Sequence, residues 1–391
     1  MKPLFISVLS CAVLFSLAPG CKSLVSLKLP PPAETRTESD WMMLGRNLQR
    51  QHFTLLDIAP PLEMVWQKKV KSVVADHPLA LGDVIFAPAV NGFMYLVDYH
   101  SGEGITTIKL GPSLKGVPSI YQNTLYAGLT LGPESLLRFD LKSGERELSH
   151  DYPYITTSPL VVENKLYFGT NRNVFFCANR ISGISIWEYI TAAPVSSSAA
   201  LSGMRVIFGD EKGWFYALDA VSGTELWKVR LEGSIFSHPV VDDSLAYLGT
   251  VAGKFYGIDL QDGRVRWMHS SPGSFFSSPA LFEDALYVGN NAHEVLALDK
   301  RTGALIWKFK TGGIVNTTPL PSPHYLYFTS WDKNLYVVER QSGELAFTFP
   351  LRHASKSSPV IYRDLLLIHT ANDALIALAN EKIVENWRIE Q

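Results

Sequence analysis

Two histidines are the residues of this chain whose types and spacing could most readily support chemistry. His77 and His238 each directly precede a proline, and both fall at the same position of a repeat described below. Imidazole is a common metal ligand and titrates near neutral pH, so the pair could form a metal or anion site. If the repeats close into a ring, however, the two side chains lie on opposite sides of its axis. Because Zn–N bonds of about 2.1 Å could not bridge that gap, we predict two polar residues lining a water-filled funnel, and no metal.

The other reactive groups also favour a structural interpretation. Three cysteines cannot form a disulfide scaffold, and Cys177 lies in the strand-like run Val174–Ala178, where a small buried hydrophobic residue is expected. The repeated Asp-x-x-x-Gly segments lack the dense oxygen ligands of calcium loops. The sequence contains no nucleophile elbow, zinc motif or phosphate loop. We therefore predict no catalytic residue and no cofactor, and a protein that is not an enzyme.

The composition excludes further classes of protein. Lys and Arg total 35 against 37 Asp and Glu, with no basic run, which argues against a nucleic-acid binder. The apolar content of 47% is too high for a disordered chain. Aromatic residues at 12%, with 28 Gly and 23 Pro among 391 residues, indicate a β protein rich in turns.

The first twenty residues have the pattern of a secretory signal peptide. Lys2 supplies a positive charge, Leu4–Leu17 an apolar stretch, and Ala18–Gly20 a cleavage site before Cys21. Small residues before a cysteine resemble the lipobox of bacterial lipoproteins, although the leucine usual three residues before the cysteine is missing. The resemblance implies an acylated Cys21 that anchors the protein in the cell envelope, with residues 21–44 as lipidated N-terminus and tether. The alternative is a soluble secreted protein.

A repeat of about 40 residues organises the rest of the chain. The turn motif Asp-x-x-[Ser/Thr]-Gly has its clearest copies at Asp219–Gly223 and Asp299–Gly303. The glycines that end the motif are Gly102, Gly144, Gly183, Gly223, Gly263, Gly303 and Gly343. Four residues after most of them comes a large aromatic residue: Trp187, Trp227, Trp267, Trp307 and Phe347, with Trp387 in a degenerate eighth copy. A column of prolines runs about twenty residues ahead, from Pro78 to Pro359.

Each repeat indicates four short strands. In the sixth copy they are Ser277–Leu281, Ala285–Gly289, Glu294–Asp299 and Ala304–Phe309. The motif's Asp can accept turn N–H groups and its Gly can take a positive φ. Four antiparallel strands repeated eight times predict an all-β, eight-bladed β-propeller over residues 45–391. The aromatic column would then fill the gaps between neighbouring blades.

An additional copy of the outer-strand pattern precedes the first blade. It is Leu62–Lys68, with Trp66 in the aromatic phase. Because open ends would expose a strand edge, we hypothesise that this segment pairs with the C-terminal blade and closes the ring. Closure by a C-terminal strand is the alternative.

The repeat resembles the PQQ-like, or quinoprotein-type, propeller repeat, as in Leu286–Gly289 followed by Ala297–Asp299, Gly303 and Trp307. A single propeller of this size behind a lipoprotein signal resembles the BamB family, lipoproteins of the outer-membrane β-barrel assembly machinery. The resemblance implies a non-enzymatic scaffold with protein partners, monomeric within a complex, on the periplasmic side of the outer membrane. BamB-type chains hold their partner with long loops between blades, for which a 40-residue period leaves no room. No contact residues are therefore carried over.

Two other functions stay open. Quinoprotein dehydrogenases hold PQQ and Ca²⁺ in the funnel against adjacent cysteines, and this chain has no adjacent pair. A ligand-binding or glycan-binding sensory propeller is the second alternative, with a channel mouth as the natural concave site. The sequence identifies neither the partner nor the face that binds it.

Overall fold

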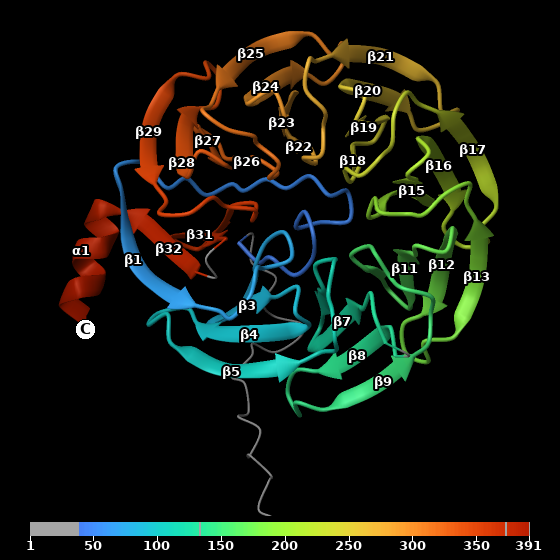
Figure 1. The fold of residues 1–391 in the computed structure, drawn as a ribbon, viewed down its shortest axis with the longest axis horizontal. Coiled ribbons are helices and arrows are strands. Elements are labelled where there is room, and N and C mark those ends of the chain that lie inside the picture. Colours follow the sequence, from blue (N-terminus) through green and yellow to red (C-terminus); the bar gives the residue numbers. More distant parts are fainter. Residues whose placement is uncertain (1–38, 133, 372–373, 391) are drawn as a thin grey trace, which may run out of the picture.

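The computed structural model describes residues 39–132, 134–371 and 374–390. They form eight four-stranded antiparallel sheets arranged in a ring (Figure 1), which confirms the predicted eight-bladed β-propeller. The predicted signal peptide, Cys21 and most of the predicted tether lie outside the described residues.

The blades follow one another along the chain, and each is numbered here from its inner to its outer strand. Blade 1 consists of β2 (Leu79–Leu81), β3 (Val84–Pro88), β4 (Phe93–Asp98) and β5 (Gly104–Lys109). Blade 2 consists of β6 (Ser119–Tyr121), β7 (Thr124–Gly128), β8 (Leu136–Asp140) and β9 (Arg146–His150). Blade 3 consists of β10 (Leu160–Val162), β11 (Lys165–Gly169), β12 (Val174–Asn179) and β13 (Ser185–Ile190). Blade 4 consists of β14 (Ala200–Ser202), β15 (Arg205–Gly209), β16 (Trp214–Asp219) and β17 (Glu225–Arg230). Blade 5 consists of β18 (Val240–Val241), β19 (Leu245–Gly249), β20 (Lys254–Asp259) and β21 (Val265–Ser270). Blade 6 consists of β22 (Ala280–Phe282), β23 (Ala285–Gly289), β24 (Glu294–Asp299) and β25 (Leu305–Lys310). Blade 7 is β26 (Leu320–Pro321), β27 (Tyr325–Ser330), β28 (Asn334–Glu339), β29 (Leu345–Pro350), and blade 8 is β30 (Val360–Tyr362), β31 (Leu365–Thr370), β32 (Ala374–Asn380) and β1 (Leu62–Lys69).

Burial follows a strand's position in its blade. The inner strand β22 is buried throughout, whereas β25 at the outside buries Trp307 and exposes the residues on either side of it. The inner strand begins three residues later than predicted, because Ser277 and Ser278 do not pair within the blade. The Ser277 hydroxyl donates to the Thr317 carbonyl of blade 7 at 2.8 Å, and Ser278 accepts from blade 5.

The ring closes with a strand from the start of the chain. β1 pairs antiparallel with β32, with Leu62 opposite Asn380 and Lys69 opposite Ala374. This confirms the hypothesis that Leu62–Lys68 completes the C-terminal blade, and it excludes closure by a C-terminal outer strand. Because β1 already occupies the outer position of blade 8, the chain after β32 has no sheet edge to join.

The chain after β32 forms α1 (Glu381–Glu390), the one helix among the described residues. Trp387 therefore keeps the aromatic spacing of the repeat but lies on a helix. Its ring makes an edge contact with Tyr99 at 5.7 Å and stacks on His100 at 6.0 Å, centroid to centroid. α1 thus covers the seam between blades 8 and 1. Within the described part of the chain, no helix has the length and apolar character needed to cross a bilayer.

The hydrophobic core is divided among the seams between blades. One cluster, for example, joins Ile207 and Ala217 of blade 4 to Val241 and Ile258 of blade 5. Each blade therefore buries apolar side chains against its neighbours, as in other repeat proteins. Cys177 is fully buried, as predicted, and burial raises the pKa of its thiol to about 12.

Candidate functional site

The middle of the ring is crossed by residues 39–61, here called the strap (Figure 1). Three of its large side chains belong to the core: Trp41 is 0% exposed, Arg50 3% and His52 2%. The predicted tether extended to residue 44, but Met43 and Leu44 are buried as well. The packed chain therefore begins earlier than that boundary, because the apolar residues that follow Asp40 insert between the inner strands.

The strap hydrogen-bonds to the inner strands at a single repeat position. Its carbonyl groups accept N–H groups as follows: Met42 from Ile120, Leu48 from Leu201, Gln49 from Val241 and Gln51 from Leu281. Thr54 donates its N–H to the Pro321 carbonyl, Trp41 exchanges two backbone bonds with Ala80, and the Trp41 indole donates to the Ile361 carbonyl at 2.8 Å. Every blade except blade 3 is thus bonded to the strap.

A tight turn brings Arg50 into the centre. Gly45 has a φ of 65°, and a Cβ there would lie 2.8 Å from the Arg50 Cα, so only glycine fits. The Arg50 guanidinium donates to the carbonyl of Leu44 at 2.5 Å and to that of Ala199 at 2.9 Å. Burial lowers the pKa of Arg50 to about 9. The strap therefore links its own turn to blade 4 through a buried cation.

His77 uses both ring nitrogens in the same region. Nδ1 lies 2.9 Å from the Pro78 carbonyl, and Nε2 lies 3.3 Å from the Gly45 N–H. A carbonyl can only accept, so Nδ1 carries the proton and Nε2 accepts. The ring lies 5.5 Å from that of His52 and 5.4 Å from that of Trp41. Burial lowers the pKa of both histidines, that of His52 to about 3. His77 is neutral and has no lone pair left for a metal.

His238 and Asp76 complete the polar centre. His238 Nδ1 accepts the Ser198 N–H at 2.9 Å, and burial lowers the pKa of this histidine to about 4. Burial by itself raises the pKa of Asp76, but His77, His238 and the Ser358 hydroxyl, which donates to it at 2.6 Å, outweigh burial and lower the pKa. Asp76 is therefore a charged carboxylate that accepts the Ser358 hydroxyl and lies close to two histidines.

The expected open funnel was wrong. The side chains of Arg50 and His52 fill the space that would separate His77 from His238, and the void left beside them is about 10 Å³, room for about one water molecule. The sequence pattern could not show this, because the filling residues come from outside the repeats. In residues 39–390, where described, no three His, Cys, Asp or Glu side chains are grouped to hold a metal ion.

Hydroxyl groups at the repeat position of His77 and His238 connect the blades. At the position before the column proline, a hydroxyl accepts the backbone N–H of the equivalent residue one blade earlier. The pairs are Val117 to Ser158, Ser158 to Ser198, His238 to Ser278 and Thr318 to Ser358, at 2.8–2.9 Å. The repeat therefore encodes a polar ring around the axis.

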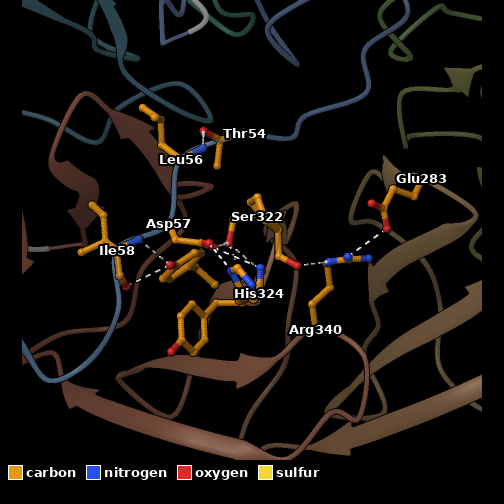
Figure 2. A network of polar contacts seen from close by, with 11 residues as sticks. Thr54, Leu56, Asp57, Ile58, Glu283, Ser322, His324 and Arg340 are labelled. Carbon is orange, nitrogen blue, oxygen red and sulfur yellow. Dashed lines mark hydrogen bonds and ion pairs between the residues drawn. The ribbon is translucent and has the colours of Figure 1, made fainter.

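Blade 7 holds the end of the strap through a side-chain network (Figure 2). The Asp57 carboxylate accepts from the Ser322 hydroxyl at 2.5 Å and from the His324 backbone N–H at 3.1 Å, and it pairs with the His324 ring. Burial raises the pKa of Asp57, but these hydrogen bonds outweigh it and lower the pKa. One residue on, Ile58 bonds twice to the Tyr327 hydroxyl at 2.9 Å. Asp57 thus positions the strap just before it enters β1.

The predicted seam residues lie between blades. Each of five tryptophans lies over the turn glycine of the next blade, where a Cβ would come within 2.7 Å of the indole: Trp66 over Gly102, Trp187 over Gly223, Trp227 over Gly263, Trp267 over Gly303 and Trp307 over Gly343. All seven motif glycines, including Gly144 and Gly183, have φ values of 69–74°. Phe347 lies half-buried on β29 beside blade 8, which has no such glycine.

Four of these indoles also donate a hydrogen bond. Their Nε1–H groups reach the carbonyl 33 residues later at 2.9–3.0 Å, from Trp66 to Tyr99, Trp227 to Leu260, Trp267 to Lys300 and Trp307 to Arg340. Trp187 differs, because the equivalent carbonyl, Ala220, accepts from Lys165 and Tyr167 instead. The buried Trp187 Nε1 has no partner among the described residues.

Sequence reasoning missed the strap residues Trp41, Arg50 and His52. The available signal was the segment Trp41–Asn47 ahead of the repeats, whose Gly45 is the residue type that a turn of positive φ requires. The non-glycine residues Arg50 and His52 also have positive φ, 60° and 49°, and no residue pattern indicates that conformation.

The fold and the repeat chemistry define a PQQ-like β-propeller. The sequence model of the family described as "Outer membrane protein assembly factor BamB" matches residues 182–313 and 291–391, together more than half of the chain. The chain belongs to that family. A search of curated proteins finds no matching sequence.

Solved structures of the same fold include proteins of different function. BamB from Moraxella catarrhalis is 19% identical and superposes with a TM-score of 0.69 over 81% of this chain and 99% of that chain. The quinohemoprotein alcohol dehydrogenase ADHIIG from Pseudomonas putida HK5 is 12% identical, with a TM-score of 0.74 over 88% and 80% of the two chains. The computationally designed Ika8 protein is 13% identical, with a TM-score of 0.71 over 80% and 98%. At these identities, the likeness concerns the fold.

Proposed function

We propose that this protein is a non-enzymatic scaffold that takes part in the assembly of outer-membrane proteins. The observation that carries the proposal is membership of the BamB family over residues 182–391. The strap supports it, because Arg50 and His52 fill the axis of the ring, and loops and strand ends at the surface are where propellers usually meet their partners.

The proposal includes the location of the protein in the cell. Residues 1–20 act as a signal peptide, Cys21 carries the lipid, and the residues that follow tether the propeller to the periplasmic face of the outer membrane. An acylated terminus anchors a protein because each buried CH₂ contributes about 0.8 kcal/mol. Cys21→Ser should move the protein from the membrane fraction to the soluble fraction. Unchanged partition into detergent would contradict lipidation at this residue.

Crosslinking in the native envelope, followed by purification and identification of partners, tests the scaffold role. We expect components of the β-barrel assembly machinery to be recovered with the protein. Recovery of glycan, or of no protein at all, would contradict the proposal and favour a sensory or ligand-binding propeller. The Cys21→Ser chain is the matched control, because it separates partners bound by the propeller from partners met only at the membrane.

The fold is shared with quinoprotein dehydrogenases, which hold PQQ in the funnel of the propeller. The central void of about 10 Å³ beside Arg50 and His52 is far too small for a fused-ring quinone, and the chain has no adjacent cysteine pair. These residues do not fit the cofactor. Addition of PQQ with Ca²⁺ should leave the melting temperature unchanged, and a rise of several degrees would reopen the enzymatic alternative.

A further inference from the structure

A cavity of about 660 Å³ opens beside the strap at the inner strands of blades 2 and 3. Its volume lies in the range of sites that bind small ligands or short peptide segments. Its wall is mainly apolar, with Met42, Met43, Leu48, Phe53 and Val161 among the lining residues, and it also carries the charged residues Asp40, Arg46 and Glu163. The cavity is therefore suited to apolar side chains.

The cavity lies at the one blade that the strap does not bond. Val161 of β10 has the repeat position of Ile120 and Leu201, which both donate their N–H to the strap. Among the described residues, neither the N–H nor the carbonyl of Val161 has a hydrogen-bond partner outside its own blade, because the strap turns back on itself between Met43 and Arg50. Val161 is 1% exposed, and a buried backbone group without a partner costs about 1–3 kcal/mol.

An extended segment would satisfy this strand. A chain laid along β10 can offer a carbonyl and an N–H to Val161, as Trp41 does to Ala80 of blade 1. Its side chains alternate between two faces, so every second one would enter the apolar cavity. The required ligand is thus a short strand with apolar residues at alternate positions.

We propose that residues 24–29 of this chain bind in the cavity. Val25, Leu27 and Leu29 alternate with Ser26 and Lys28, the pattern of a half-buried strand. The segment is also close at hand, because the strap begins at Ser39 and Asp40 lines the cavity. The intervening residues 30–38 span at most about 30 Å when fully extended, enough for the chain to return. Glu163 on the cavity wall would complement Lys28.

Binding of this segment would decide how the propeller is presented to the membrane. Cys21 lies four residues before Val25, a reach of about 14 Å. If Cys21 carries a lipid, as proposed above, the bound segment holds this face of the ring against the membrane, and release extends the tether. The binding itself does not rest on the scaffold role or on lipidation, and it is tested in a chain without lipid.

A disulfide test uses the chain from residue 21 with Cys21→Ser, in which Cys177 is fully buried and unreactive. Leu27→Cys is combined with Val162→Cys, on the cavity wall, or with Met204→Cys, 55% exposed just beyond the inner strand of blade 4. We expect an intramolecular disulfide at least tenfold faster in the Val162 pair. Equal rates for the two pairs, or a disulfide only between two copies, would overturn the proposal.

Hydrogen exchange provides a second measurement. In a chain with Val25→Asp, Leu27→Asp and Leu29→Asp, we expect the Val161 amide to exchange at least tenfold faster than in the chain with the natural segment. The Leu201 amide, already bonded to the Leu48 carbonyl, should be unchanged and reports that the ring is intact. Equal protection of Val161 in both chains would show that another group, or water, occupies the site.

Discussion

The seam between blades 4 and 5 and the seam between blades 8 and 1 have the same contact, although the chain reaches them differently. Trp227 lies over Gly263 and donates to the Leu260 carbonyl at 2.9 Å, while Trp66 lies over Gly102 and donates to the Tyr99 carbonyl at 3.0 Å. In both cases donor and acceptor are 33 residues apart. The unit that repeats in sequence is therefore an outer strand followed by the next blade, and β1 is the outer strand of the first such unit.

Blade 8 therefore needs both ends of the chain. Three of its strands come from residues 360–380 and its outer strand from residues 62–69. The seam contact of β1 is as regular as those inside the chain, and among the described residues the β1–β32 pairing is the sheet pairing that joins the two ends of the chain into a closed ring. Closure should therefore be the most sensitive point of the structure.

Deletion of residues 60–70 is expected to have the largest effect. It removes β1 and exposes the edge of β32, so the loss of stability should exceed the roughly 3–5 kcal/mol expected for truncating Trp66 alone. Differential scanning calorimetry should show a collapse of the melting temperature. Met64→Ser, a change at an exposed position of the same strand, is the control. An unchanged melting temperature after the deletion would refute closure by β1.

Truncation of a seam tryptophan ranks next. Trp227→Ala should lower the free energy of unfolding by about 3–5 kcal/mol. Trp187→Ala should cost about 1 kcal/mol less, because the Trp187 Nε1–H has no partner among the described residues and no hydrogen bond is lost. Denaturant unfolding of both variants gives the difference. Equal losses would show that the indole hydrogen bond contributes nothing to the seam.

The turn glycine allows a sharper test of the same seam. Gly263 and Gly203 both have positive φ, 73° and 54°, but a Cβ at Gly263 would lie 2.7 Å from the Trp227 ring, whereas at Gly203 nothing lies within 4 Å. Both alanine variants carry the backbone cost, so their difference isolates the contact. Gly263→Ala should cost about 1–3 kcal/mol more than Gly203→Ala in urea unfolding. No difference would mean that the indole moves freely.

The seams could be predicted from sequence because the residues that form them recur at fixed intervals along the chain. A positive-φ turn requires glycine within the motif, and the aromatic residue follows at a fixed distance, so the columns appear without any three-dimensional information. The strap could not be predicted in this way. Trp41 bonds to Ala80 and to Ile361, partners that become neighbours only once the ring has closed. The helix that carries Trp387 was missed because this residue keeps the aromatic spacing of an outer strand, although β1 already occupies the outer position of blade 8.

The polar centre predicts a dependence on pH. Burial lowers the pKa of His52 to about 3 and that of His238 to about 4, below the ordinary value of about 6.5 in an unfolded chain. As pH falls below about 6.5, the unfolded chain binds these protons and the folded chain does not, so stability decreases until about pH 3–4. Each histidine contributes a slope of up to about 1.4 kcal/mol per pH unit.

His52→Gln should remove one such contribution. Free energies of unfolding measured from pH 7 to pH 4.5 should fall less steeply in this variant than in the wild type. Leu55→Ala, at an exposed and uncharged position of the strap, should keep the wild-type slope. An unchanged slope in His52→Gln would show that His52 is protonated in the folded protein.

The smallest effect is expected where the strap leaves the centre, at Asp57. Its partner ring, His324, is 78% exposed, and exposed ion pairs contribute about 0–1 kcal/mol. Asp57→Asn keeps an oxygen that can accept from the Ser322 hydroxyl and removes only the charge, so the cost should stay below about 1 kcal/mol in urea unfolding. Asp57→Ala should cost more than Asp57→Asn, because the Ser322 hydroxyl and the His324 N–H then lose their acceptor. Equal destabilisation of the two variants would show that the charge of Asp57, and not its hydrogen bonds, holds the strap to blade 7. The strap would then be attached differently from the blades, which are joined to one another by uncharged hydroxyl contacts.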